Sequence, residues 1–175
     1  MNYRPLGNTG IQVSEIGLGC WQLGNNIDWQ TGSFNDAIKI INKAIECGCT
    51  FFDTAPGYSK GQSEEILGRA LHSTRKDRVI STKFGYSTEE IFDFSTKLIR
   101  PSLENSLRRL QTDYVDVFIM HSPPTDIIVN GLSEQCDELD KLKTEGKIKS
   151  YGISVENRLE FETVLNTTKS QAIEV

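Results

Sequence analysis

Short apolar runs that end on polar residues alternate with helical patterns along this chain. The clearest runs lead into Asp53, Lys83 and His121. They are Thr50–Phe52, Arg78–Thr82 and Tyr114–Met120. The runs are rich in β-branched and aromatic residues, which is typical of strands. Strands that alternate with helices form parallel sheets, so the pattern predicts an α/β fold with these three polar residues at strand ends.

The same pattern extends over the rest of the chain. Further strands are predicted at residues 15–19, 149–153 and 172–175. Helices are predicted where apolar residues recur every three or four positions: from Ser33 to a stop at Gly48, from Ser63 through Leu71, through Leu103, Leu107 and Leu110, from Ser133 to a stop at Gly146, and from Asn157 to Asn166. Ser33 and Asp36 form a capping-box pattern, and Pro101 is expected in the first turn of its helix or at a bend.

The amino terminus and the chain length complete the predicted fold. Residues 3–6 and 11–13 flank the turn Gly7-Asn8-Thr9-Gly10, which predicts a β-hairpin. The remainder is typical of a (β/α)8 TIM barrel truncated at about strand six, because six strands cannot close a barrel that needs about 250 residues. We expect residues 1–175 to form a single, incomplete barrel domain. Its exposed sheet edges are expected to allow self-association.

Composition and charge narrow the classes of function. A net charge of −5 and a pI near 5.1 argue against a nucleic-acid partner. The chain has no run of eighteen apolar residues and no signal-peptide pattern, so we expect a cytoplasmic protein without a membrane partner. The four cysteines include no CxxC pair, and only two histidines accompany them, so we expect reduced thiols and no metal site. A small molecule is the expected partner.

Four polar residues are predicted to meet at one end of the barrel. Asp53, Lys83 and His121 follow three successive strands, and Tyr58 lies in the loop just after Asp53. The carboxyl ends of barrel strands and the loops after them face a shared mouth, where barrel enzymes hold their active sites. We therefore expect the four side chains to converge.

This combination suits the reduction of a carbonyl by hydride transfer. The reaction needs a hydride on carbon and a proton on the developing alkoxide. Tyr58 is the predicted proton donor, because an ammonium such as Lys83 beside a phenol lowers the pKa of the phenol. Asp53 would keep Lys83 charged and in place, and His121 would donate a hydrogen bond to the substrate oxygen.

Each of these residues alone has an ordinary structural explanation. An aspartate at a strand end is more often a helix cap or an ion-pair partner, and a tyrosine in a Gly-Pro loop more often packs. A histidine at a strand end is functional in a minority of cases. Their joint placement on three consecutive strands and the adjoining loop favours the functional interpretation.

Five longer stretches show that the chain resembles the aldo-keto reductase superfamily. They are LGNTGIQVSEIGLGCWQLG (allowing for Pro5 ahead of it), FFDTAPGYSKGQSEEILGRAL, STKFG, SLRRLQTDYVDVFIMH and GKIKSYGISVEN. The resemblance implies the amino-terminal two thirds of a (β/α)8 barrel that reduces an aldehyde or ketone with NADPH, with NADH as the alternative. It also implies that Asp53, Tyr58, Lys83 and His121 form the catalytic tetrad, with Tyr58 as proton donor.

The resemblance implies further contacts with cofactor and substrate. Gly19, Cys20 and Trp21 correspond to a loop beside the nicotinamide, together with Asp53. Ser154 corresponds to a residue that binds the carboxamide. Glu174 stands where the family usually has Gln, and Ser59 stands where Gly commonly follows the tyrosine. The expected substrate-binding residues are Trp21, Trp29 and His121.

One other interpretation of the chain is disfavoured and two stay open. A Rossmann fingerprint is disfavoured, because Gln22 stands where the third glycine after Gly17 and Gly19 would fall and no helix begins there. A regulatory barrel that senses nicotinamide redox state would keep the same residues without turnover. An inactive fragment is the third interpretation, because the family's main cofactor clamp follows strands seven and eight.

Overall fold

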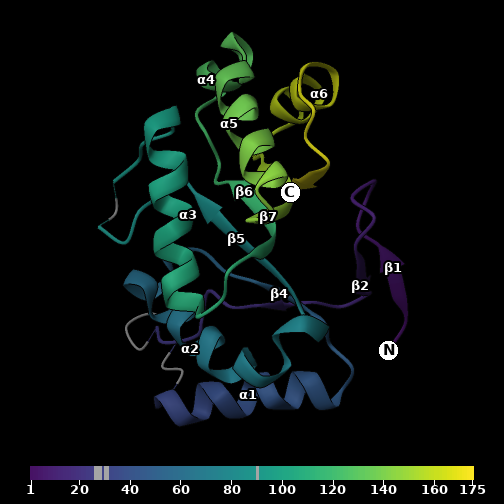
Figure 1. Ribbon diagram of the computed structural model, residues 1–175, viewed down its shortest axis with the longest axis vertical. Coiled ribbons are helices and arrows are strands. Elements are labelled where there is room, and N and C mark those ends of the chain that lie inside the picture. Colours follow the sequence, from purple (N-terminus) through teal and green to yellow (C-terminus); the bar gives the residue numbers. More distant parts are fainter. Residues whose placement is uncertain (26–28, 30–31, 90) are drawn as a thin grey trace.

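A parallel sheet of six strands forms the centre of the molecule (Figure 1). The structure, a computed structural model, describes residues 1–25, 29, 32–89 and 91–175. The strands follow one another in sequence order, and in the described residues β3 and β8 are the edges. They are β3 (Leu18–Gly19), β4 (Phe51–Asp53), β5 (Val79–Phe84), β6 (Val115–Met120), β7 (Ile148–Ser154) and β8 (Ala172–Glu174). The predicted fold class, a barrel of parallel strands that does not close on itself, is confirmed.

The amino-terminal hairpin is confirmed as well. β1 (Tyr3–Pro5) and β2 (Gln12–Ser14) pair antiparallel, with Tyr3 opposite Ser14. The backbone N–H of Ser14 donates to the Thr50 hydroxyl over 2.9 Å, and Thr50 immediately precedes β4. The hairpin therefore lies at the amino ends of the strands, opposite the end where a site is predicted.

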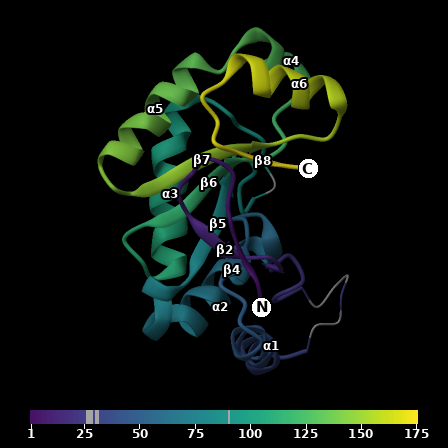
Figure 2. The same ribbon diagram turned by 90° about the vertical axis from the view of Figure 1, so that its right-hand side faces the viewer.

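Helices cover the outer side of the curled sheet (Figure 2). They are α1 (Phe34–Glu46), α2 (Gln62–Leu71), α3 (Thr96–Leu110), α4 (Thr125–Asn130), α5 (Ser133–Thr144) and α6 (Arg158–Thr167), with 3-10 turns η1 (Tyr58–Gly61) and η2 (His72–Asp77). The capping box of Ser33 and Asp36 is present, and Asn157 caps α6 by accepting a hydrogen bond from the backbone of Glu160. None of the described helices combines the length and the hydrophobicity needed to span a bilayer.

Several predicted details differ from the structure. The strand expected at residues 15–19 pairs only at Leu18 and Gly19. Pro101 lies in the second turn of α3 rather than the first, because that helix already begins at Thr96. The helix predicted to start at Ser63 begins one residue earlier. The short helix α4 after Pro124 was not predicted, because six residues are too few for a periodic pattern.

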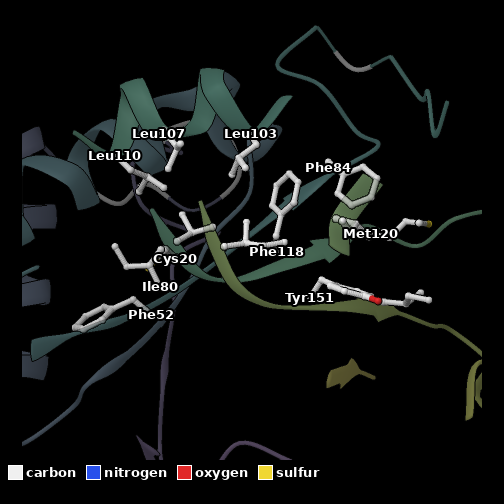
Figure 3. Close-up of a cluster of buried hydrophobic side chains, with 14 of the residues drawn as sticks. Cys20, Phe52, Ile80, Phe84, Leu103, Leu107, Leu110, Phe118, Met120 and Tyr151 are labelled. Carbon is white, nitrogen blue, oxygen red and sulfur yellow. The ribbon is translucent and has the colours of Figure 1, made fainter. Parts of the chain in front are cut away.

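Alternation along the strands separates an outer face from an inner face. Phe52, Ile80, Phe84, Phe118 and Met120 point outward and belong to the same buried cluster as the α3 residues Leu103, Leu107 and Leu110 (Figure 3). Inward side chains such as Phe51, Ser81, Val117 and Ile119 line a hollow of about 310 Å³. Successive residues of a strand point to opposite faces. Asp53 and Lys83 therefore share the inner face, at the carboxyl ends of their strands.

A buried ion pair joins the sheet to two helices. Glu64 of α2 is fully buried, and its carboxylate accepts hydrogen bonds from Thr82 and Arg109 at 2.6 Å each. The side chain of Arg109 is 19% exposed. Arg109 therefore faces the protein interior, whereas the neighbouring Arg108 is exposed.

Candidate active site

The four predicted catalytic residues meet at the carboxyl ends of β4, β5 and β6. Asp53 is the last residue of β4, Lys83 lies near the end of β5, and His121 directly follows β6. Tyr58 begins the 3-10 turn after β4. The parallel register, with Lys83 opposite Ile119 and Asp53 opposite Ser81, brings these ends together. The structure thus assembles the whole predicted set.

Lys83 is the centre of the group. Its side chain is fully buried, and its ammonium lies 2.5 Å from the Asp53 carboxylate and 3.4 Å from the Tyr58 hydroxyl. It also donates to the carbonyl oxygen of Thr54 over 3.2 Å and lies 3.4 Å from the Glu174 carboxylate. Burying a charged lysine costs free energy, so lysines are almost never fully buried unless they are paired.

The surroundings keep Lys83 charged. Burial disfavours the ammonium, but Asp53, Tyr58 and Glu174 together outweigh it and raise the pKa of Lys83 above its usual value. Burial also raises the pKa of Glu174, and the neighbouring Asp53 adds to this shift. The predicted function of Asp53 in holding a charged Lys83 agrees with this arrangement.

Tyr58 differs from the sequence-based expectation in its acidity. Burial raises the pKa of its phenol, and this effect exceeds the lowering caused by Lys83. The ammonium acts in the predicted direction, but the net shift is upward. Tyr58 is therefore held protonated near neutrality.

His121 is held as a neutral ring. Burial lowers its pKa to about 4, and the charge of Lys83 adds to this lowering. Its ring is perpendicular to that of Tyr58, with centroids 6.0 Å apart. Its backbone N–H donates to Phe84 O over 2.9 Å, whereas its buried Nδ1 atom has no hydrogen-bond partner. A neutral imidazole carries one N–H donor and one acceptor.

The chain leaves Tyr58 through a strained turn. Ser59 and Lys60 have φ values of 51° and 55°, in the left-handed region, and Gly61 follows with 90°. Non-glycine residues in this region cost roughly 1–2 kcal/mol each. A glycine at position 59 would reduce this strain, so Ser59 makes the turn more costly in this chain.

Hydrogen bonds buried behind the site connect two strand ends to α2. The Ser63 hydroxyl donates to Cys20 O over 2.7 Å and lies 2.9 Å from the hydroxyl of Thr54. All three residues are fully buried, and the backbone N–H of Cys20 donates to Asp53 O over 2.8 Å. The sequence pattern predicts Ser63 only as a helix start and does not indicate these hydrogen bonds. A serine on the inner side of an amphipathic helix was the available signal.

A pocket of about 610 Å³ opens beside Tyr58 and His121. Its described lining also includes Trp21, Gly57, Lys60, Tyr86, Phe92, Ser122 and Glu156. Trp21, predicted to bind both cofactor and substrate, lies in this wall with 48% of its surface exposed. Trp29 packs against Trp21 with ring centroids 5.3 Å apart, so it supports the wall from the side.

The predicted nicotinamide contacts lie next to this group. Ser154 and Glu174 are paired in register at the ends of β7 and β8. The Ser154 hydroxyl accepts from Ser122 N over 2.7 Å and lies 3.3 Å from Met120 O. The Cys20 side chain points into the core (Figure 3), which leaves Gly19 and Trp21 as the exposed part of the first loop.

The described residues contain no group of three or more metal-ligating side chains. The free cysteines are Cys20, Cys47, Cys49 and Cys136, of which Cys47 is exposed.

Comparison with known proteins agrees with this geometry. The aldo/keto reductase family model matches residues 15–172. The chain belongs to the aldo/keto reductase family. It is 40% identical over 154 residues to an L-galactose dehydrogenase of Arabidopsis thaliana. The matched stretch covers 86% of this chain and 47% of that protein. It is 35% identical over 164 residues to an NADH-specific methylglyoxal reductase of Escherichia coli. That match covers 85% of this chain and 50% of the reductase.

Solved structures of the family share the fold. The holo form of an aldo-keto reductase from Bacillus halodurans superposes with a TM-score of 0.88 at 32% identity, over 99% of this chain and 56% of that one. The chain spans about half the length of the curated relatives it matches. Family membership is therefore shown for the barrel strands and loops that carry the candidate site.

Proposed function

We propose that this protein reduces an aldehyde or ketone by hydride transfer from a nicotinamide cofactor, with Tyr58 as proton donor. One observation carries the proposal: the buried Lys83 ammonium lies 3.4 Å from the Tyr58 hydroxyl and 2.5 Å from the Asp53 carboxylate, beside His121 and an open pocket. A buried cation next to a phenol at the edge of a pocket is an arrangement of perturbed titratable groups that is typical of catalytic sites.

The residues divide the chemistry between them. A bound reduced nicotinamide would supply the hydride to the carbonyl carbon. Tyr58 would give its proton to the carbonyl oxygen, and Lys83 would stabilise the phenolate that remains. Asp53 keeps the ammonium in place. The neutral ring of His121 would donate a hydrogen bond that orients the carbonyl oxygen.

We propose NADPH as the cofactor, with NADH as the alternative. Gly19, Trp21, Ser154 and Glu174 supply the exposed backbone, the aromatic face and the polar groups for the nicotinamide end. Glu174 is a carboxylate, so it would accept a hydrogen bond from the carboxamide nitrogen and cannot donate one unless protonated. The choice between the two cofactors depends on groups that bind their distant phosphate end.

Replacing Tyr58 by Phe tests the assignment. Turnover of a simple aldehyde by the 175-residue chain should fall at least about 100-fold, since loss of a general acid costs 10²–10⁴ in rate. Binding of NADPH, followed by nicotinamide fluorescence, should be unchanged. Tyr3→Phe, in the exposed hairpin at the other end of the barrel, is the matched control.

Three results would count against the proposal. Undiminished turnover in Tyr58→Phe would remove the proton-donor assignment. Micromolar NADPH binding without turnover on any carbonyl would instead support a nicotinamide sensor. No NADPH binding into the millimolar range would mean that this chain alone lacks a working cofactor site.

A further inference from the structure

Two carboxylates reach the Lys83 ammonium from different parts of the sheet. Asp53 ends β4, which is the neighbour of β5, the strand that carries Lys83. Glu174 ends β8, which β6 and β7 separate from β5. The Glu174 carboxylate nevertheless lies 3.4 Å from the Lys83 ammonium, because the sheet curls and Asp53 and Glu174 both line its inner hollow. The contact therefore joins a distant strand to the middle of the sheet.

The backbone of Glu174 is held by the neighbouring strand. Glu174 pairs in register with Ser154, and its carbonyl oxygen accepts from Val155 N over 3.0 Å. A β-carbon at Gly152 would lie 2.4 Å from Ala172 O, so only glycine lets β8 approach β7 this closely. The Glu174 side chain is 41% exposed. Its position at Lys83 is therefore set by a fixed strand and not by burial of the carboxylate itself.

The Lys83 ammonium has fewer hydrogens than neighbours that accept them. An ammonium carries three N–H donors. Its hydrogen bonds run to the Asp53 carboxylate at 2.5 Å, to Thr54 O at 3.2 Å and to the Tyr58 hydroxyl at 3.4 Å. The Glu174 carboxylate is a fourth acceptor. Tyr58 has the longest of the three bonds and carries no charge, so it is the partner that a second carboxylate displaces most readily.

The charges around Glu174 act in the same sense. Among the described residues, the titratable groups that face it are Asp53 of β4, Lys83 of β5 and Tyr58 of η1. Burial raises the pKa of Glu174, Asp53 adds to the rise, and Lys83 lowers it. Burial is also the main cause that raises the pKa of Tyr58, and the Asp53 and Glu174 charges add to it. Glu174 therefore opposes the stabilisation of a Tyr58 phenolate by Lys83.

We propose that Glu174 is a positioning residue for the proton donor, because its ionised carboxylate competes with the Tyr58 hydroxyl for the third hydrogen of the Lys83 ammonium. The consequence for catalysis rests on the proposed function. While Glu174 holds the ammonium, Lys83 stabilises the Tyr58 phenolate less, and proton transfer from Tyr58 is harder. A ligand group that engages the Glu174 carboxylate frees the ammonium for Tyr58. A glutamine at this position carries no charge and would compete only weakly.

Titration of Tyr58 in the ligand-free protein tests the competition. Phenolate absorbance is followed against pH, and the curve of the corresponding Tyr58→Phe chain is subtracted to isolate Tyr58. Glu174→Gln should raise the ratio of phenolate to phenol about three- to tenfold at a fixed pH, as expected for the loss of one nearby charge. Glu174→Asp keeps the charge and should stay closer to the unsubstituted chain. Glu162→Gln, on the outer helix α6, removes an exposed charge and should change nothing.

A reciprocal titration keeps Glu174 in place. Carbon NMR of labelled carboxyl groups follows its ionisation. Tyr58→Phe leaves the third ammonium hydrogen to Glu174, so the ratio of carboxylate to carboxylic acid at a fixed pH should rise at least about twofold. Tyr3→Phe, in the hairpin at the other end of the barrel, is the control. No rise in Tyr58→Phe would overturn the competition even if Glu174→Gln does not fold.

The outcomes separate this inference from the proposed function. An unchanged or smaller phenolate fraction in Glu174→Gln would overturn the competition. Equal effects of Glu174→Gln and Glu174→Asp would also overturn it, because a merely structural contribution to β8 would give that result. Turnover of a simple aldehyde by the unsubstituted chain would then leave the proposed function standing. The expected titrations without turnover of any carbonyl would support the competition and overturn the function.

Turnover adds a third readout. If Tyr58 donates the proton, kcat/KM falls at alkaline pH as Tyr58 ionises. This fall should begin at lower pH in Glu174→Gln than in the unsubstituted chain. A fall that begins at the same pH in both chains would overturn the inference that Glu174 acts on the proton donor.

Discussion

The Lys83 ammonium lies 2.5 Å from the Asp53 carboxylate, although thirty residues separate the two along the chain. The Lys83 side chain is fully buried, whereas that of Asp53 is 24% exposed. Removing one member of the pair is therefore expected to affect the stability of the fold differently from removing the other. Removal of the carboxylate leaves a buried charge, but removal of the ammonium leaves a carboxylate that water still reaches.

We expect Asp53→Ala to destabilise the fold more than Lys83→Met. Breaking a buried pair so that a charge is left costs about 3–5 kcal/mol, whereas an apolar replacement of the buried group costs much less. Urea denaturation at pH 7 measures both free energies of unfolding. Asp113→Ala, at an exposed aspartate, is the control and should change stability by less than about 0.5 kcal/mol. A larger loss in Lys83→Met would contradict this assignment.

The buried carboxylate of Glu64 predicts strong coupling to Arg109. Arg109→Met should lower the free energy of unfolding by about 3 kcal/mol, because Glu64 then keeps only the Thr82 hydroxyl as a partner. The double variant Glu64→Gln/Arg109→Met should recover at least about 1 kcal/mol, since the buried charge is gone. Arg108→Met, at the neighbouring exposed arginine, is the control. Additive losses in the double-mutant cycle would show that the pair is not coupled.

The lowered pKa of His121 predicts a loss of stability in mild acid. Its pKa is about 4 in the folded protein, against an ordinary value of 6.5. The unfolded chain therefore binds the proton more readily between these values, and stability falls as the pH drops from about 6.5 to 4. The contribution is at most about 3 kcal/mol. His121→Gln should flatten this part of the curve of unfolding free energy against pH, whereas His72→Gln, at an exposed histidine, should not.

The buried hydroxyl of Ser63 predicts a local effect on the first two strands. Ser63→Ala leaves the Cys20 carbonyl and the Thr54 hydroxyl each without one partner, which should cost about 1–3 kcal/mol. Because Cys20 precedes Trp21, tryptophan fluorescence should shift as well. Ser73→Ala, at an exposed serine, should change neither quantity. Full stability in Ser63→Ala would mean that water or a neighbour replaces the hydroxyl.

Periodicity was sufficient to predict most of the architecture. The runs before Asp53, Lys83 and His121 are strands, and the helices between them cover the sheet, because alternate burial and helical amphipathicity are local properties of the chain. Predictions failed where tertiary contacts decide the outcome. Pro101 is accommodated in the second turn of α3, and β3 pairs over only two residues.

The candidate site likewise combines features that the sequence predicts with features that only tertiary contacts decide. The convergence of Asp53, Tyr58, Lys83 and His121 could be predicted from their positions at strand ends. The net upward shift in the pKa of Tyr58 could not, because it depends on how completely the fold buries the phenol. Nor could the pairing of Glu64 with Arg109 be predicted, since each residue alone is typical of a solvated helix face.

By itself the sequence determined the order of strands and helices, the family of the fold, and the four polar residues that end up together. Those features follow from hydrophobic period and residue type, which act over a few residues. Only the tertiary structure decided which hydroxyls and charged groups are buried away from water, and which groups these pair with. Burial and electrostatic pairing depend on segments far apart in the chain, and they set the acidity of Tyr58 and His121.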